Sequence, residues 1–200
     1  MTGRPRAFGI LAFDDVEVLD ACGPFEVFSV AARLLGREPE PTELTVTLIS
    51  AHPGRSSVVA RGGLVLGTHA SLEDAPDLDL LLVPGGVTDA VERDARVIDW
   101  IAARAGTPTI ASVCTGAFLL AEAGILTDQR VTTHWEDQAA LAERFPRLDV
   151  VDGPRWIRQG EVYTSAGISA GIDLALHLVD RIQDGLGARV ARQMDYDWRA

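Results

Sequence analysis

The chain has 200 residues, 47% of them hydrophobic, and a formal net charge of −11 at pH 7. A chain of this length and composition can bury one large core, so we expect a single domain over residues 1–200. The negative charge repels phosphate backbones and anionic lipid, which argues against nucleic-acid and membrane partners. The first apolar run is short and soon meets Asp14 and Asp15, so no signal peptide or membrane span is predicted and a cytoplasmic protein is favoured.

Strands and helices are expected to alternate along the chain, the pattern of a mostly parallel sheet covered by helices on both faces. Strands are predicted at 7–13, 44–50, 79–83, 110–113, 131–133 and 148–151. Helices are predicted at 20–35, 94–104, 136–145, 169–182 and 187–196, and from Gly116 onward. The first helix opens near Asp20, with Pro24 in its first turn. A β-rich segment is also predicted at 56–68, and a β-hairpin at 156–164 around Gln159-Gly160.

The two cysteines, Cys22 and Cys114, are far apart and lack the spacing of a disulfide scaffold or zinc site, which favours a reducing compartment. His52, His69 and His177 have no carboxylate or thiol partners at ligand spacing, so no metal is expected. The chain also lacks a Rossmann fingerprint and a Walker motif, and no other cofactor is expected.

Cys114 stands between the apolar run 110–113 and an Ala-rich apolar helix. A side chain at such a sharp strand-to-helix turn stands clear of the sheet and faces the first free amides of the helix. Those amides and the helix dipole predict a thiol pKa lowered from about 8.5 to roughly 3.5–7.5, hence a nucleophilic thiolate. The alternative is a small buried hydrophobe, because free cysteine is among the most buried residue types.

Three predicted strands end in turns that carry chemically useful residues. In open α/β sheets, ligands bind beyond the carboxyl ends of the strands. If these turns are neighbours, Asp20 supplies a carboxylate, Gly85 and Gly86 supply backbone amides, and Cys114 supplies a nucleophile. Alternatively, Asp20 is a helix N-cap. The glycines are also typical of a tight turn that requires positive φ, and this is compatible with the amide role.

Five blocks between Val18 and Val179 resemble the ThiJ/PfpI superfamily, and most closely its isonitrile hydratase branch: VLDACGPFEVF, LLVPGG, SVCTGAFLLAEAGIL, VTTHW and YTSAGISAGIDLALHLV. The resemblance implies a flavodoxin-like three-layer α/β sandwich with a cysteine nucleophile elbow, and a homodimer. The same blocks resemble sensor-like domains fused to AraC-type regulators. Those regulators continue into a helix-turn-helix region, whereas this chain ends at Ala200, so a regulator would require a longer chain.

By this resemblance, Cys114 is the nucleophile, Asp20 the acid/base, and Thr115 helps to fix the reacting group. Many relatives outside the hydratases have glutamate at the position of Asp20, so the aspartate favours the hydratase branch. Gly85 and Gly86 resemble glycines whose amides help to stabilise a developing anion.

His134 matches a histidine found near the nucleophile in several relatives. Beside Trp135 it is equally consistent with a packed, hydrogen-bonded core residue. His134-Trp135-Glu136 also mimics the His-x-Glu of class I glutamine amidotransferases. In that family the pair lies near the chain's end, where this chain has no histidine, so a glutaminase triad is not expected. Cys22 is either a resolving thiol or, more simply, small apolar packing.

The resemblance therefore implies a cofactor-independent enzyme that adds water to a small-molecule isonitrile to give an N-substituted formamide, through a cysteine thioimidate. Two alternatives remain open. One is a different cysteine-dependent enzyme of the superfamily, acting on glyoxals or on glycated or peptide substrates. The other is a non-catalytic sensor domain in which Cys114 is a redox or ligand site.

Overall fold

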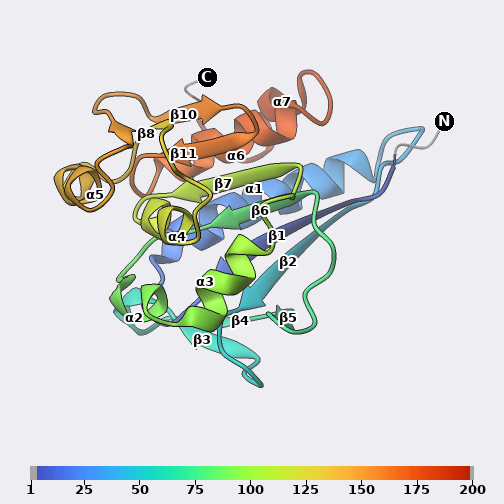
Figure 1. Ribbon diagram of the computed structural model, residues 1–200. Helices are drawn as coiled ribbons and strands as arrows, with labels where there is room; N and C mark the ends of the chain where they lie inside the picture. Colours follow the sequence, from blue (N-terminus) through green and yellow to red (C-terminus); the bar gives the residue numbers. More distant parts are fainter. Residues whose placement is uncertain (1–3, 199–200) are drawn as a thin grey trace.

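The computed structural model describes residues 4–198, in which a mostly parallel sheet lies between two layers of helices (Figure 1). Within those residues the main sheet has seven strands, in the order β10 (Trp156–Gln159), β11 (Val162–Ser165), β7 (Thr109–Val113), β6 (Leu80–Val83), β1 (Arg6–Ala12), β2 (Leu44–Ser50) and β5 (Ala70–Ser71). Every neighbouring pair is parallel except the β10–β11 hairpin. The expected flavodoxin-like α/β fold is confirmed.

The helices form a layer on each face of the sheet. One layer comprises α1 (Val18–Leu35), α6 (Ala170–Asp180) and α7 (Leu186–Gln193). The other comprises α2 (Asp89–Glu92), α3 (Ala95–Ala102) and α4 (Gly116–Glu122). Smaller elements flank these layers: the antiparallel pair β3 (Ser57–Val59) and β4 (Val65–Gly67) around the 3-10 turn Arg61–Gly63, and α5 (Gln138–Arg144) with the parallel pair β8 (Arg130–Val131) and β9 (Asp149–Val150).

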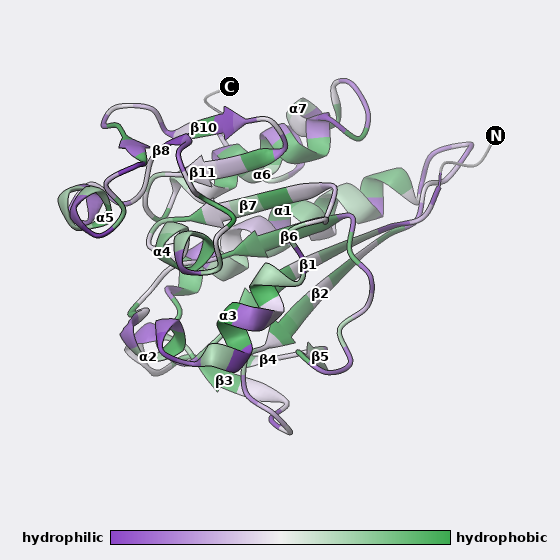
Figure 2. Ribbon diagram, viewed as in Figure 1, coloured by the Kyte–Doolittle hydropathy of each residue, from purple (hydrophilic) through white to green (hydrophobic). Residues whose placement is uncertain are grey.

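The core is built on the central strands, because β6 is buried along its whole length and β7 along all but its first residue. Figure 2 shows β6 and much of β7 in green, whereas α2 and α5 include purple, hydrophilic residues. On α6, Ile172, Leu174, Leu176 and Leu178 are at most 9% exposed, so these four residues belong to the core and are not available for a contact with a second copy. In the part of the chain that the structure describes, no helix is both long and apolar enough to cross a membrane.

The first helix differs from its sequence prediction. α1 begins at Val18 after Glu17, so Pro24 lies inside the helix and not in its first turn. Proline usually breaks a helix interior, but tertiary packing overrides local preference. Buried residues on both sides of Pro24, such as Ala21 and Phe28, fix α1 against the rest of the core. The short elements β5 and α2 were not predicted, because segments of two to four residues carry too little periodicity.

Candidate active site

The elbow at Cys114 is strained in the way that a nucleophile turn requires. Cys114 directly follows β7, has a positive φ of 55° and is 7% exposed. Two glycines allow the turn to pack. A Cβ on Gly116 would lie 2.1 Å from the Val83 carbonyl oxygen, and one on Gly85 would lie 2.5 Å from the Thr115 nitrogen. The predicted strand-turn-helix geometry is therefore present, and these glycines permit it.

Hydrogen bonds from three segments hold the elbow in place. The Cys114 N–H donates to the Ser165 carbonyl (3.1 Å), and the buried Thr133 hydroxyl donates to the Cys114 carbonyl (2.7 Å). The Thr115 hydroxyl accepts from the Gly86 N–H (2.8 Å) and donates to the Gly86 carbonyl (2.9 Å). Thr115 thus lies next to Cys114, with its hydroxyl engaged in tying the elbow to the turn after β6.

Asp20 lies in the first turn of α1 and is fully buried. Its Oδ2 accepts a hydrogen bond from the Gly85 N–H (3.1 Å), whereas its Oδ1 is buried without a hydrogen-bond partner in residues 4–198. The N-cap of α1 is Glu17, so the capping alternative for Asp20 is wrong. A buried carboxyl with an unpaired oxygen is costly unless it binds a proton, and this oxygen is free to do so.

Burial sets the protonation of the Asp20–Cys114 pair. Loss of solvent raises the pKa of Asp20 from 3.8 to about 7, and the Glu17 carboxylate adds to the rise. The Gly85 N–H, the Cys114 side chain and the Ile168 backbone act in the opposite direction. Near neutral pH the carboxyl is therefore poised to give or take a proton.

The expected low pKa of Cys114 is wrong. Burial raises the thiol pKa from 9.0 to about 12, and the neighbouring Asp20 carboxylate and the Asp137 carboxylate raise it further. The Thr115 N–H and hydroxyl lower it, but less. α4 has only seven residues, and the Asp20 carboxylate lies beside the thiol, so the helix start does not lower the thiol pKa. At neutral pH the site holds a neutral thiol beside a partly protonated carboxyl.

Gly85 and Gly86 lie next to the pair, but both amides already have side-chain acceptors. The Gly85 N–H donates a hydrogen bond to Asp20 Oδ2, and the Gly86 N–H donates one to the Thr115 hydroxyl. The sequence had suggested that these amides stabilise a developing anion. In this structure both amides instead donate to side chains and orient the site. Gly86 also has φ 142°, and a Cβ there would meet the Asp15 carbonyl oxygen at 2.3 Å, so the tight-turn interpretation holds for Gly86.

His134 lies beside the site, one residue after Thr133. Its Nδ1 is 3.4 Å from Asp137 Oδ2, and its ring packs so closely on Gly167 that a Cβ there would lie 2.0 Å from His134 Cδ2. His134 lines a cleft of about 330 Å³ together with Trp135, Arg155 and Ile168.

Cys22 is half-buried on α1, and burial raises its thiol pKa. Within residues 4–198, no three His, Cys, Asp or Glu side chains are grouped to hold a metal.

The sequence interpretation missed several residues of the site. The Ile168 backbone acts on the Asp20 carboxyl, and Ile168 has φ 52°, which is uncommon for a β-branched residue. Thr133 supports the elbow, and Asp137 affects the thiol. The VTTHW and YTSAGISAG blocks contain Thr133 and Ile168, but nothing in either block indicates a contact with Cys114 or Asp20.

A cysteine at a strained strand-to-helix elbow, with a buried carboxyl beside it on a mostly parallel sheet, places the protein among α/β proteins with a nucleophile elbow. More specifically, the chain belongs to the DJ-1/PfpI family, whose model matches residues 6–181. It is similar to a solved ThiJ/PfpI family protein from Pseudomonas syringae, with a TM-score of 0.84 and 25% identity over 98% of this chain and 77% of that one.

Two characterised relatives differ in kind. The chain is 33% identical over 181 residues to the isonitrile hydratase of Pseudomonas putida, covering 87% of this chain and 71% of that protein. It is also 33% identical over 180 residues to the HTH-type transcriptional regulator GbdR of Pseudomonas aeruginosa strain UCBPP-PA14, covering 89% of this chain and 47% of that protein. The chain thus spans about half the length of the regulator.

Proposed function

We propose that this protein is an isonitrile hydratase, which adds water to R–N≡C and releases the formamide R–NH–CHO. The observation that carries the proposal is the buried Cys114–Asp20 pair, in which the carboxyl has a pKa of about 7. Hydration of an isonitrile needs a nucleophile for the terminal carbon and a group that gives and takes one proton near neutral pH. The identity to the Pseudomonas putida hydratase supports this reaction over other thiol chemistry.

In the first step the Asp20 carboxylate takes the proton of the Cys114 thiol and passes it to the isonitrile carbon as the sulfur attacks that carbon. One S–H bond breaks, and one C–H and one C–S bond form, giving the thioimidate R–N=CH–S–Cys114. Because the thiol pKa is about 12, the thiolate exists only as it reacts, and the adjacent carboxylate makes this possible.

In the second step Asp20, again a carboxylate, takes a proton from water while the oxygen attacks the thioimidate carbon. Asp20 passes that proton to the nitrogen, and the remaining hydroxyl proton returns to sulfur as the C–S bond breaks. The products are the formamide and the free thiol, so one water is consumed and no redox change occurs. The amide of Gly85 keeps Oδ2 fixed, which leaves Oδ1 for proton transfer.

Purified protein with a metal chelator, assayed on cyclohexyl isocyanide, tests the proposal. We expect N-cyclohexylformamide from the wild type and none from Cys114→Ala. Asp20→Asn should lose about 10²- to 10⁴-fold in rate, the usual contribution of general acid–base catalysis. Cys22→Ala is the matched cysteine control and should retain activity. Turnover of methylglyoxal alone would instead indicate another cysteine-dependent enzyme of the family.

A second candidate function is a ligand-sensing domain, favoured by the similarity to the regulator GbdR. In that case Cys114 and Asp20 would form part of a binding site without turnover. A folded protein that converts neither isonitrile nor methylglyoxal, but whose Cys114 is protected from alkylation by a bound small molecule, would support this candidate.

A further inference from the structure

The cleft beside the elbow has the position and size of a substrate compartment. Its volume of about 330 Å³ falls within the range of about 300–1,000 Å³ that is typical of small-molecule sites. It is walled by the segment from His134 to Gln138, by residues 152–155 and by the loop between β11 and α6.

Two of these walls, the first and the last, are continuous with residues that hold Cys114. Thr133, which donates to the Cys114 carbonyl, directly precedes His134 in one wall. Ser165, which accepts from the Cys114 N–H, directly precedes Ala166 in the other. Ile168, whose backbone acts on Asp20, also lines the cleft. These connections place the cleft next to the Cys114–Asp20 pair.

Two exposed apolar side chains flank the cleft. Trp135 is 70% exposed and Ile168 is 37% exposed, although both are large hydrophobic residues. Exposed apolar groups gathered around a hollow are typical of a ligand site. The indole of Trp135 offers a flat face, which suits an aromatic ring.

One polar group in the cleft is held in place by a buried charge. Arg155 forms an ion pair through Nε with Asp173, which is fully buried and also accepts from the Tyr196 hydroxyl (3.0 Å). Nη2 lies 3.4 Å from the Ser169 hydroxyl, and the Arg155 side chain remains 35% exposed. The guanidinium is thus oriented and retains donor capacity toward a ligand.

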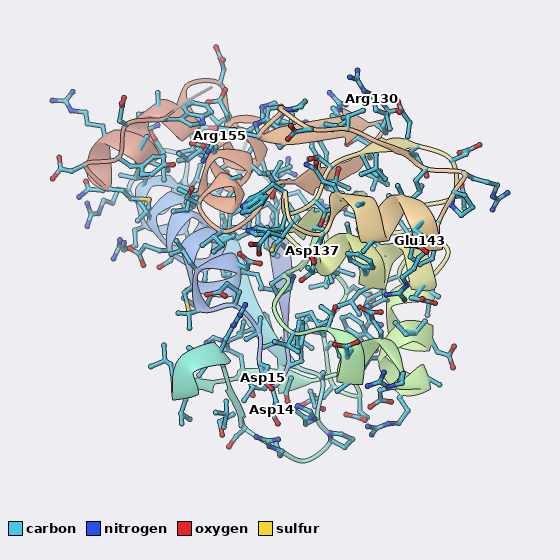
Figure 3. The ribbon with its side chains drawn as sticks, turned by 90° about the vertical axis from the view of Figure 1, so that its left-hand side faces the viewer. Asp14, Asp15, Arg130, Asp137, Glu143 and Arg155 are labelled. Carbon is cyan, nitrogen blue, oxygen red and sulfur yellow. The ribbon has the colours of Figure 1, made fainter. Side chains whose placement is uncertain are left out.

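The charges around the cleft favour a neutral ligand. Asp173 balances Arg155, while Asp137 on one wall and Asp152 on the cleft's lining add negative charge. Figure 3 shows Arg155 near the top of the view and Asp137 near its middle, both away from Asp14 and Asp15 near the bottom. An anionic group would meet Arg155 already neutralised and carboxylates nearby, so repulsion would outweigh attraction.

We propose, building on the isonitrile hydratase function, that this cleft holds the R group of the substrate, and that the R group is a neutral aryl body ending in a hydrogen-bond acceptor. Trp135 and Ile168 pack against the body, and Arg155 donates to the acceptor. Trp135 and Arg155 are therefore the residues that determine specificity, with Asp173 as the positioning residue for Arg155.

The test compares three aryl isonitriles whose para substituents are methoxy, methyl and carboxylate. We expect the wild-type ratio of kcat/KM for methoxy over methyl to fall roughly 5-fold in Arg155→Met, the size of one hydrogen bond of about 1 kcal/mol. Comparing ratios cancels the intrinsic reactivities of the two substrates. The carboxylate should be the poorest substrate of the wild type. Arg130→Met, on β8 and 57% exposed in its side chain, is the matched control.

Trp135→Ala should raise KM for both neutral aryl substrates by roughly 2- to 10-fold without lowering kcat, the usual range for an aromatic contact. Val59→Ala, at an exposed position on β3, is its control. Since Arg155→Met leaves Asp173 buried without its cation, the double variant Arg155→Met/Asp173→Asn removes both charges and keeps the ratio measurable if the single variant does not fold.

A binding measurement separates this inference from the reaction itself. Calorimetric titration of Cys114→Ala protein with N-(para-methoxyphenyl)formamide should show binding that weakens with Trp135→Ala and with Arg155→Met. Binding to Cys114→Ala, together with no isonitrile turnover by the wild type, would refute the hydratase function and retain the cleft. Three results would overturn the inference. The first is turnover in which Arg155→Met leaves the methoxy-over-methyl ratio of kcat/KM unchanged and Trp135→Ala leaves KM unchanged. The others are preference for the carboxylate substrate and absence of both turnover and binding.

Discussion

Replacing Asp20 with asparagine tests whether the carboxyl holds a proton in the folded protein. Asparagine keeps the shape and an acceptor for the Gly85 N–H but cannot ionise. In the wild type, the native state retains its proton up to about pH 7, whereas the unfolded chain releases it near pH 3.8. Because the native state binds more protons in this window, its stability falls as pH rises from about 4 to about 7 and then levels off.

Each pKa unit corresponds to about 1.36 kcal/mol, so the shift is worth about 4 kcal/mol as an upper estimate. Relative to the wild type, Asp20→Asn should therefore gain up to about 4 kcal/mol in unfolding free energy between pH 4 and pH 8. Urea unfolding of both proteins across this range measures the difference, and other titrating groups cancel. A difference that does not change with pH would mean that Asp20 ionises normally and that the proposed proton transfer lacks its basis.

Three further predictions follow from the elbow and the surface. Alkylation of Cys114 should show an apparent pKa above that of free cysteine, because burial and Asp20 raise it, and Asp20→Asn should lower that value; a pH profile like that of free cysteine would contradict the geometry. Gly85→Ala should lower the free energy of unfolding in urea by about 1–3 kcal/mol, since its Cβ would overlap the Thr115 nitrogen and hydroxyl. Gly106→Ala, with no atom within 4 Å of its Cβ, is the control, and equal effects of the two variants would refute the close approach at Gly85. Sedimentation at micromolar concentration should show a homodimer, with Leu64 and Val65 among the exposed apolar residues available for the contact; a monomer would remove this prediction without affecting the chemistry.

The sheet and the elbow were predictable because each depends on local patterns. Apolar runs of four to seven residues marked the buried strands, and Gly160 marked the β10–β11 hairpin, where it has φ 63°. The Cys114 turn followed from its place between a strand and an apolar helix. The beginning of α1 was less predictable, because Pro24 and Asp20 both mimic a helix start and only the tertiary packing carries the helix through them.

The protonation of the site could not be predicted from the sequence. A helix start lowers a thiol pKa only if solvent and neighbouring charge allow it, and neither the burial of Cys114 nor its distance from Asp20 is local information. The hydrogen bonds of the Gly85 and Gly86 amides could not be predicted either. The sequence suggested that these amides face a ligand, but in the fold they donate to Asp20 and Thr115. The Arg155–Asp173 pair joins residues 18 apart and gave no pattern at all.

The most direct test of the proposed chemistry is mass spectrometry of the intact protein, acid-quenched within milliseconds of mixing with cyclohexyl isocyanide. A thioimidate adds the whole isonitrile to Cys114 and loses nothing, so the account predicts a transient mass increase equal to one isonitrile molecule. Peptide mapping should place the adduct on Cys114, and Asp20→Asn should form it slowly. Formamide production without any adduct on Cys114, or an adduct on Cys22 alone, would contradict the account.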